Sequence, residues 1–261
     1  MDGRIRAVYF SPTHCTKKLT VKTAEKLSEI FEAKTEETDL TLLKEREKEI
    51  ELNEKDILVF GFPVYGGRIP LLLELVIKKI KGGNNPVIIM SVYGNRNFDD
   101  AVLEARDIFT EKGFRVISAG AFIGEHSYTK NVGTGRPDEE DLKKAEEFAM
   151  KTVEKIKNGN NTEILKVPGN KPYKERTAGI IAAPETGEAC YDCMKCAKEC
   201  PVSAISFEDP RTADINKCIH CCACVKGCPV EAKYFDNEMM KNFTVMLETK
   251  FAGKKENIIF I

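Results

Sequence analysis

Two cysteine-rich runs constrain this chain more than any other feature of its sequence. They lie between Cys190 and Pro229 and read CYDCMKCAKECP and CIHCCACVKGCP. In each run three cysteines recur at every third residue, and a fourth cysteine is followed by proline. Thiolate is a soft ligand that binds iron strongly, and four thiolates hold one cubane of iron and sulfide. The two runs therefore predict a pair of four-iron, four-sulfur (4Fe–4S) clusters.

The spacing also predicts which cysteines share a cluster. Three closely spaced cysteines can curl around one cluster, whereas the fourth lies too far along the chain to close the same loop. In two-cluster chains with this spacing, the fourth cysteine binds the other cluster. We therefore expect two crossed ligand sets: Cys190, Cys193, Cys196 and Cys228 for cluster I, and Cys218, Cys221, Cys224 and Cys200 for cluster II. Such a unit has almost no core without its metal, so folding and cluster insertion should be coupled.

Zinc and disulfides are the alternative interpretations of these cysteines. Structural zinc uses pairs of cysteines rather than triplets closed by Cys-Pro. A disulfide framework suits a secreted chain, and no signal-peptide pattern opens this one. Ligand spacing also accounts for all of the ten cysteines except Cys15 and Cys222. We interpret Cys222 as a bystander beside the second cluster.

Composition limits the remaining classes of function. The chain has 261 residues, of which 42% are hydrophobic and 31% charged, and its formal net charge is −1. This balance favours a soluble globular protein and gives no global field that would attract nucleic acid or a membrane. No apolar run approaches about 20 residues, so no membrane span is expected. We predict a cytoplasmic protein with reduced thiols, whose redox partners and oligomeric state remain open.

Strand and helix patterns alternate through the first part of the chain. The expected strands cover residues 5–10, 33–39, 56–62, 87–93 and 115–124. Helical periodicity follows at 19–31, 41–51, 70–80, 98–112 and 137–157. This alternation predicts an α/β fold with a five-stranded, doubly wound parallel sheet in the flavodoxin-like order 2-1-3-4-5. The polar strand at 33–39 suits the edge position that this order gives it.

The rest of the chain is expected to form smaller parts. Residues 1–158 would form the sheet domain, 159–184 an ordered linker draped over it, and 185–236 a small α+β domain with two clusters. Residues 237–261 would form a carboxyl-terminal helix and tail. We expect the apolar end, NIIFI, to dock back on the body of the protein.

Cofactors of doubly wound sheets bind outside the carboxyl ends of the strands. Here that edge carries loops 11–17, 61–69, 93–98 and 124–136. Loop 11–17 offers hydroxyl groups and free amides at a helix N-terminus, which suits a phosphate, although simple capping of the helix is the alternative. In loop 61–69, paired glycines after Tyr65 allow the backbone to approach a flat ligand closely. Loop 93–97 offers Tyr93 and another glycine.

These segments give the chain a resemblance to a known family. With FSPTHCTKK, GFPVYGGRIP, SVYGNRNFDDAVLE, GEHSY, GRPDEEDL and the two cysteine runs, it resembles the flavodoxin–ferredoxin fusion proteins, and residues 1–157 resemble flavodoxin. The resemblance implies that FMN is bound. It places Ser11, Thr13, His14, Cys15 and Thr16 around the FMN phosphate. It also implies that the isoalloxazine ring is lined by Pro63, Val64, Tyr65, Gly66, Gly67, Tyr93, Gly94 and Asn95.

For each of three residues in these loops, the sequence allows two interpretations. Flavodoxins usually have glycine where this chain has His14, so the imidazole either narrows the phosphate pocket or adds a donor to it. Cys15 is interpreted as a phosphate-loop residue rather than as a nucleophile activated by the helix N-terminus. His126 either touches the flavin or the cluster domain, or is simply a hydrogen-bonded loop histidine.

The first hypothesis of function is an electron-transfer flavoprotein, which passes electrons between FMN, two 4Fe–4S clusters and an external redox partner. The alternative is a reductase that acts directly on a small molecule or on NAD(P)H. No G-x-G-x-x-G follows a strand, which disfavours a separate nicotinamide domain. A third hypothesis is a cluster-bearing binding or sensor module without flavin.

Overall fold

Six strands form the main sheet of the protein, for which the computed structural model describes residues 3–159, 163–176 and 179–261. The strands lie in the order β10-β7-β6-β4-β1-β2. Their bounds are Ile5–Tyr9 (β1), Thr35–Asp39 (β2), Ile57–Pro63 (β4), Pro86–Tyr93 (β6), Arg115–Ile123 (β7) and Ile258–Phe260 (β10). The first five in sequence are parallel and confirm the predicted 2-1-3-4-5 order, with the polar strand β2 at one edge. The fold is therefore flavodoxin-like.

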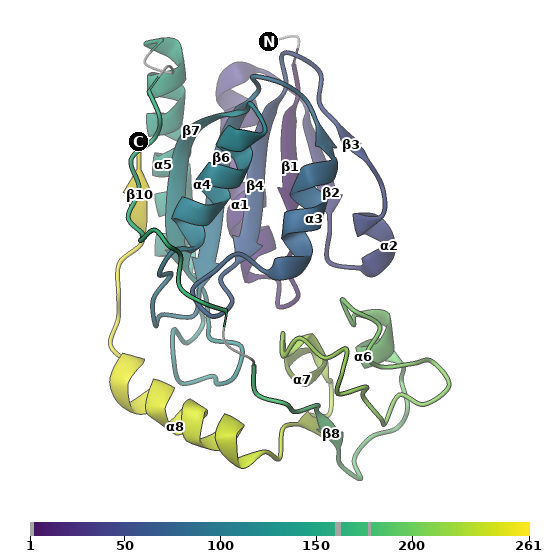
Figure 1. Cartoon of the computed structure of the whole chain (residues 1–261). Helices are drawn as coiled ribbons and strands as arrows, with labels where there is room; N and C mark the ends of the chain where they lie inside the picture. The colour runs from purple at the N-terminus through teal and green to yellow at the C-terminus, as the bar shows by residue number, and fades with distance from the viewer. Residues whose placement is uncertain (1–2, 160–162, 177–178) are drawn as a thin grey trace.

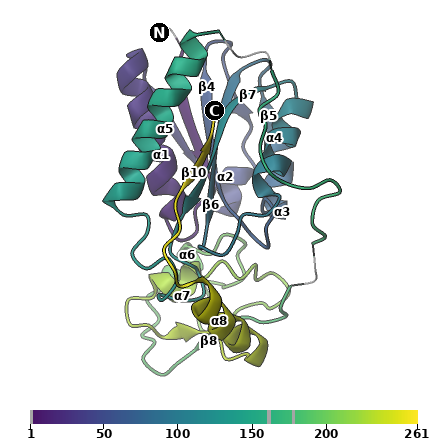
Figure 2. The same cartoon turned by 90° about the vertical axis from the view of Figure 1, so that its left-hand side faces the viewer.

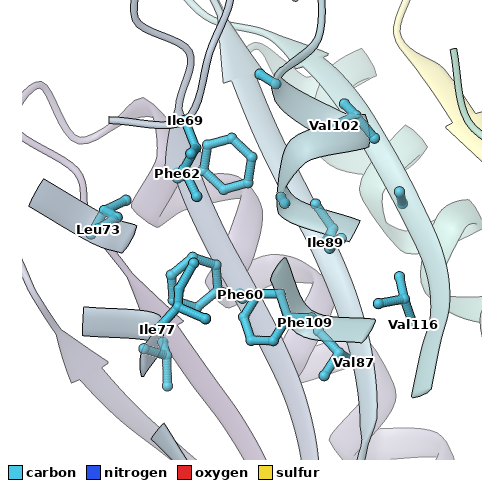
Figure 3. Packing of buried hydrophobic residues seen from close by; sticks show 14 of the residues in the cluster. Phe60, Phe62, Ile69, Leu73, Ile77, Val87, Ile89, Val102, Phe109 and Val116 are labelled. Carbon is cyan, nitrogen blue, oxygen red and sulfur yellow. The ribbon is translucent and has the colours of Figure 1, made fainter. Parts of the chain in front are cut away.

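Two layers of helices cover this sheet (Figures 1 and 2). Helices α1 (Cys15–Phe31) and α5 (Glu139–Lys157) pack on one face, and α3 (Leu71–Lys79) and α4 (Ala101–Glu111) pack on the other. The central strands are continuous apolar runs because both of their faces are buried. Figure 3 shows the core under α3 and α4, where the ring of Phe60 lies 5.1 Å from that of Phe109.

The bounds of several helices differ from the prediction because of local hydrogen bonds and strand pairing. The helix expected at 41–51 is only one turn, α2 (Leu43–Arg46), because the chain then forms β3 (Ile50–Glu51), which pairs with β5 (Ile80–Lys81). The helix expected from residue 137 begins after Asp138, whose carboxylate accepts the amide of Asp141 at 3.0 Å in a capping box. These corrections leave the sheet order unchanged.

The carboxyl-terminal tail returns to the sheet as its sixth strand. Strand β10 pairs antiparallel with β7, with Ile258 opposite Ala121. The tail is also held just before this strand, where the Asn95 side-chain amide donates to the carbonyls of Phe251 and Gly253 at 2.6 and 2.8 Å. The docking of NIIFI is thus confirmed, and it covers an edge that would otherwise expose unpaired backbone groups.

A smaller unit lies beyond the carboxyl ends of the parallel strands (Figure 1). It comprises β8 (Glu185–Thr186), α6 (Lys195–Lys198), α7 (Ala223–Gly227), β9 (Lys233–Tyr234) and α8 (Glu238–Phe251). The two cysteine runs repeat the same backbone path, since Met194 before α6 and Cys222 before α7 both have positive φ, at 65° and 60°. Within the described ranges no helix is both long and apolar enough to cross a bilayer.

The segment between the sheet and this unit packs along α4. Tyr173 donates to Asp107 at 2.5 Å, and the Arg176 guanidinium lies 2.9 Å from the buried carboxylate of Glu104. Residues 160–162 and 177–178 of the expected linker lie outside the described residues. The domain boundaries at 158, 184 and 236 stay predictions.

Candidate functional site

A cavity of about 360 Å³ opens where the sheet meets the smaller unit. Its volume lies in the range of small-molecule sites. Ten residues predicted to hold the flavin line it: Thr13, Cys15, Thr16, Pro63, Val64, Tyr65, Gly66, Gly67, Tyr93 and Gly94. They come from three separate loops, which the parallel sheet brings to one edge.

One end of the cavity is formed by the start of α1. Thr13, Cys15 and Thr16 line this end, and the first-turn amides of a helix have no partner within the helix. Ser11 lies behind them, where its buried hydroxyl accepts the amide of Lys17 at 2.9 Å. The cavity end therefore combines donor amides, hydroxyl groups and the positive end of a helix dipole, which together suit a phosphate.

His14 and Cys15 occupy this loop without filling the cavity. His14 takes a left-handed conformation (φ 66°), and its side chain is exposed to solvent. Among the described residues it is not part of the lining, so its imidazole neither narrows the cavity nor supplies a donor to it. The Cys15 thiol points at backbone carbonyls of Thr13 and Arg136, at 3.7 and 3.6 Å. Burial of this thiol raises its pKa, which argues against a nucleophile.

A tight hairpin with a two-residue turn forms one wall of the cavity. Tyr65 and Arg68 exchange both backbone hydrogen bonds at 3.0 Å, so that Gly66 and Gly67 make the turn with φ of 60° and 85°. Two positive φ values define a type I′ turn, which glycine adopts without strain. A Cβ on Gly67 would lie 2.2 Å from the Asp99 carboxylate, whereas one on Gly66 would meet open space.

Loops 93–97 and 124–128 form another part of the cavity lining. The His126 ring packs so closely on Gly94 that a Cβ there would lie 2.5 Å from the imidazole. The His126 Nδ1 accepts the amide of Tyr128 at 3.1 Å. Burial of the imidazole, together with Lys226 and Arg96, lowers its pKa to about 4. His126 therefore lines the cavity as a neutral side chain at physiological pH.

Asn95 was expected at the flavin ring but has another position. It is 1% exposed and holds the carboxyl-terminal tail through the two hydrogen bonds described above. It is absent from the described lining of the cavity, although its neighbours Gly94 and Arg96 are both present. Asn95 has a left-handed backbone conformation (φ 58°), and its side chain binds the tail rather than lining the cavity.

The smaller unit forms the roof of the cavity. Ile219, His220 and Cys221 come from the second cysteine run, and Phe243 comes from α8. The roof is tied to the sheet by an ion pair of 2.5 Å between Lys226 and Glu125. Residues of both units therefore line the cavity.

The eight predicted cluster ligands line two further cavities. Cys190, Cys193, Cys196 and Cys228 surround the first, which we call cavity I. Cys200, Cys218, Cys221 and Cys224 surround the second, cavity II. Each cavity thus gathers three cysteines of one run and the Cys-Pro cysteine of the other. Cys222 is 3% exposed and also lines cavity II, whose other residues are mostly alanine, proline, valine and isoleucine.

The thiols of these cavities interact strongly. Burial, together with the neighbouring thiols of Cys200 and Cys218, raises the pKa of Cys221 to about 12, although the Ala223 amide opposes the shift. For Cys228, which lines cavity I, the balance between burial and amide donors is reversed. Burial raises the pKa of this thiol, but the amides of Val230, Ala232 and Lys233 outweigh that effect and lower it below its usual value. Converging thiols with amide donors fit a cationic, thiolate-bound group.

No group of three or more His, Cys, Asp or Glu side chains in the described part of the chain is placed to hold a single metal ion. Four ligands of one zinc ion meet at its surface, at about 2.3 Å from the metal. Cysteines of a cubane each bind a different iron, so their sulfurs lie farther apart. The eight cysteines around cavities I and II stay predicted ligands.

The cavity of about 360 Å³, called the flavin-type cavity below because residues predicted to hold FMN line it, also has lining residues that were not predicted. Arg96, Asn97, Glu125, Ser127 and Tyr128 line it, as do Ile219, His220 and Phe243 of the roof. Their loops could be found from the strand ends, and Tyr128 belongs to the GEHSY segment. The roof could not be found, because no local pattern tells which face of a second unit meets the first.

No family model and no curated relative match this sequence. Several solved structures resemble its sheet part. A flavodoxin from the domain Archaea has 14% identity and a TM-score of 0.42, and covers 59% of this chain and 99% of its own. Oxidised flavodoxin 2 from Bacillus cereus has 19% identity and a TM-score of 0.41, with 58% and 99% covered. Two-electron reduced Megasphaera elsdenii flavodoxin has 18% identity and a TM-score of 0.39, with 56% and 98% covered. The fold assignment made above stands on the strand order itself.

Proposed function

We propose that this protein is an electron-transfer flavoprotein, which passes electrons between a bound FMN, two 4Fe–4S clusters and an external redox partner. One observation carries the proposal. The side chain of Cys221 lines both the flavin-type cavity and cavity II. A cluster ligand in the wall of a flavin site gives two redox centres that share a boundary, and no domain movement is needed to bring them together.

The residues around the larger cavity fit FMN. Donor amides and hydroxyl groups at the start of α1 would hold the phosphate. Tyr65 and the Gly66–Gly67 turn would lie along the flat ring, together with Gly94 and His126. The Tyr65 hydroxyl has a pKa well above its ordinary value because it is buried and faces the thiols of Cys221 and Cys222. It therefore stays neutral between the two sites.

The residues around cavities I and II fit two clusters. The crossed ligand sets predicted from spacing coincide with the two groups of cysteines that surround these cavities. Bound FMN exchanges two electrons and each bound cluster exchanges one, which makes the combination suited to splitting and joining electron pairs. The chain's own residues supply position, burial and hydrogen bonds, which set the potentials.

A direct reductase is the weaker candidate because of the roof over the flavin-type cavity. Ile219, His220 and Phe243 line the cavity from the smaller unit, which leaves less room for a nicotinamide or a small oxidised molecule beside a bound flavin. His220 is itself held by a contact of 2.7 Å between its Nε2 and the carbonyl of Ala182. Access by a second ligand would require this contact and the Lys226–Glu125 ion pair to open.

The test is anaerobic purification with iron, sulfide and FMN measured for each chain, followed by stepwise reduction monitored by absorption and EPR. We expect about eight irons and one FMN per chain, and electron exchange between flavin and clusters without added mediator. Protein that binds both kinds of cofactor but exchanges no electrons between them would contradict the proposal. Protein that binds no flavin would favour the binding or sensor module.

A further inference from the structure

A buried arginine next to the sheet contacts the loop that carries Cys200. Arg46 is the last residue of α2 and is only 6% exposed. Its Nη1 donates to the carbonyls of Leu40 and Thr41 at 2.9 and 2.6 Å, and its Nη2 donates to the carbonyl of Pro201. Pro201 directly follows Cys200, and both residues line cavity II. The guanidinium group therefore reaches from the sheet part of the protein to a ligand loop of the smaller unit.

Among the described residues, no carboxylate forms an ion pair with Arg46. Its hydrogen bonds go to carbonyl oxygens, and its Cζ lies 5.7 Å from the ring centroid of Phe10. Glu45, its neighbour in α2, pairs with Lys48 instead, at 2.5 Å. Burial lowers the pKa of Arg46, and the charge that opposes this effect is that of the Cys200 thiol. A buried charge is costly unless an opposite charge offsets it, so the charge that Arg46 faces is a predicted ligand of cavity II.

The other charges near cavity II are either paired or shared with cavity I. No acidic or basic side chain of the described chain lines cavity II itself. Lys226 acts on one of its thiols but pairs with Glu125 at 2.5 Å. Asp214 lies in the loop that precedes the second cysteine run, and it is 3.4 Å from Lys217. The Lys233 ammonium acts electrostatically on thiols of both cavities, so it does not distinguish them.

We propose that Arg46 is the counter-charge of the cluster in cavity II, and that it holds the reduction potential of this centre above the value that a neutral side chain would give. This inference rests on the proposed function, which places a thiolate-bound cluster there. Four thiolates give such a centre a net negative charge, and reduction adds one more. A nearby cation stabilises the reduced form more than the oxidised form, because the attraction grows with the charge. Since cavity II borders the flavin-type cavity, the effect falls on the centre next to the flavin.

The experiment measures the potential of each centre separately in the full-length protein. Cys228→Ser removes a predicted ligand of cavity I, so that an EPR-monitored redox titration reports the cluster of cavity II. In this background we expect Arg46→Gln to lower the equilibrium constant for one-electron reduction about tenfold, which lowers the potential by about 59 mV. Arg46→Lys keeps the positive charge and should change the constant less than about threefold. In the Cys200→Ser background, which retains the cluster of cavity I, Arg46→Gln should leave the potential unchanged.

Arg6→Gln is the matched control for loss of a buried arginine. Arg6 is also 6% exposed, but it pairs with Glu36 at 3.0 Å. It also donates to the carbonyl of Glu51 at 2.8 Å and lies 3.8 Å from Asp56, so these partners all precede the smaller unit in the chain. We expect Arg6→Gln to lower the free energy of unfolding without changing the potential of either cluster.

A measurement on the wild-type protein decides the question if Arg46→Gln does not fold. A charge that favours the reduced centre must, by linkage, hold α2 more tightly to the Pro201 loop once the centre is reduced. Hydrogen exchange at residues 43–47 should therefore slow by up to about tenfold on reduction, while exchange in α5 stays the same.

The possible outcomes separate this inference from the proposed function. Equal potentials of the cavity II centre with Arg46 and with Arg46→Gln, or equal shifts for Arg46→Gln and Arg46→Lys, would overturn the inference alone. Equal exchange of α2 in the two oxidation states would do the same. Wild-type protein that binds no cluster or no flavin would overturn the proposed function instead.

Discussion

Glu125 and Lys226 form an ion pair with 2.5 Å between the carboxylate and ammonium groups, and both side chains are about one-fifth exposed, at 23% and 19%. Glu125 follows β7 and also accepts the amide of Gly135 at 3.0 Å, whereas Lys226 belongs to α7, which carries Cys224. The pair therefore joins a wall of the flavin-type cavity to the helix beside cavity II.

Removing one charge of this ion pair should weaken the packing of the smaller unit against the sheet. Glu125→Gln leaves Lys226 partly buried without a counter-charge, and we expect a loss of about 1–3 kcal/mol in the free energy of unfolding. The double variant Glu125→Gln with Lys226→Met should recover part of that loss, because the uncompensated charge is then removed. Urea unfolding of the four proteins of this cycle measures the coupling. Strict additivity of the two single effects would show that the pair contributes nothing.

The turn glycines should differ in their tolerance of alanine. Gly66→Ala places a methyl group in open space. Its main effect is the strain of a left-handed φ at alanine, which costs about 1 kcal/mol of stability. Gly67→Ala adds a collision with Asp99 at 2.2 Å and should distort the wall of the cavity. We expect FMN affinity, measured by quenching of flavin fluorescence, to fall at least about tenfold more for Gly67→Ala than for Gly66→Ala. Equal losses would mean that the turn does not touch the flavin.

Crossed ligation makes a specific prediction for the two Cys-Pro cysteines. Cys200→Ser lies in the first run but should remove the cluster of cavity II, and Cys228→Ser should remove the cluster of cavity I. Each variant should retain about four irons per chain. Only Cys228→Ser should keep rapid electron exchange with the flavin, because cavity II borders the flavin site. Cys222→Ser is the matched control and should retain all of the iron.

His126 should make stability depend on pH. Its pKa is about 4 in the folded protein, below the ordinary value of 6.5, because burial disfavours the imidazolium and Lys226 and Arg96 repel it. Between these two values the unfolded chain binds a proton that the folded chain does not. The free energy of unfolding therefore falls as pH decreases, by about 2 kcal/mol between about pH 7.5 and pH 5. Urea unfolding of the wild type and of His126→Gln at several pH values checks this, and the variant should lack that part of the slope.

Asn95 should control the docking of the carboxyl-terminal tail. Asn95→Ala removes two hydrogen bonds to the carbonyls of Phe251 and Gly253, and leaves those groups partly buried, at a cost of about 1–3 kcal/mol. Hydrogen exchange in β10 should accelerate, while β6 stays protected. Asn216→Ala, at an exposed position, is the control. Unchanged exchange in β10 would show that strand pairing with β7 alone holds the tail.

Local patterns in the sequence determined much of this protein. Continuous apolar runs such as Val59–Phe62 mark strands buried on both faces, and the alternation with helices predicts the parallel order that the sheet adopts. The cysteine spacing predicts the two ligand sets, because three thiols at every third residue can surround one centre and the fourth cannot. The loops of the flavin-type cavity followed from the ends of the strands.

Contacts between distant segments were decided only by the tertiary structure. The sequence could not show that Asn95 binds the tail, that His14 points to solvent, or that β10 closes the sheet edge. Nor could it show which of two equally spaced cysteine runs lies next to the flavin-type cavity. The fold places Cys221 in the wall of the flavin-type cavity and leaves Cys193 at the surface. The physical reason is that ligand spacing is a local property, whereas the orientation of the cysteine-rich unit depends on long-range contacts such as Lys226 with Glu125 and Arg46 with Pro201.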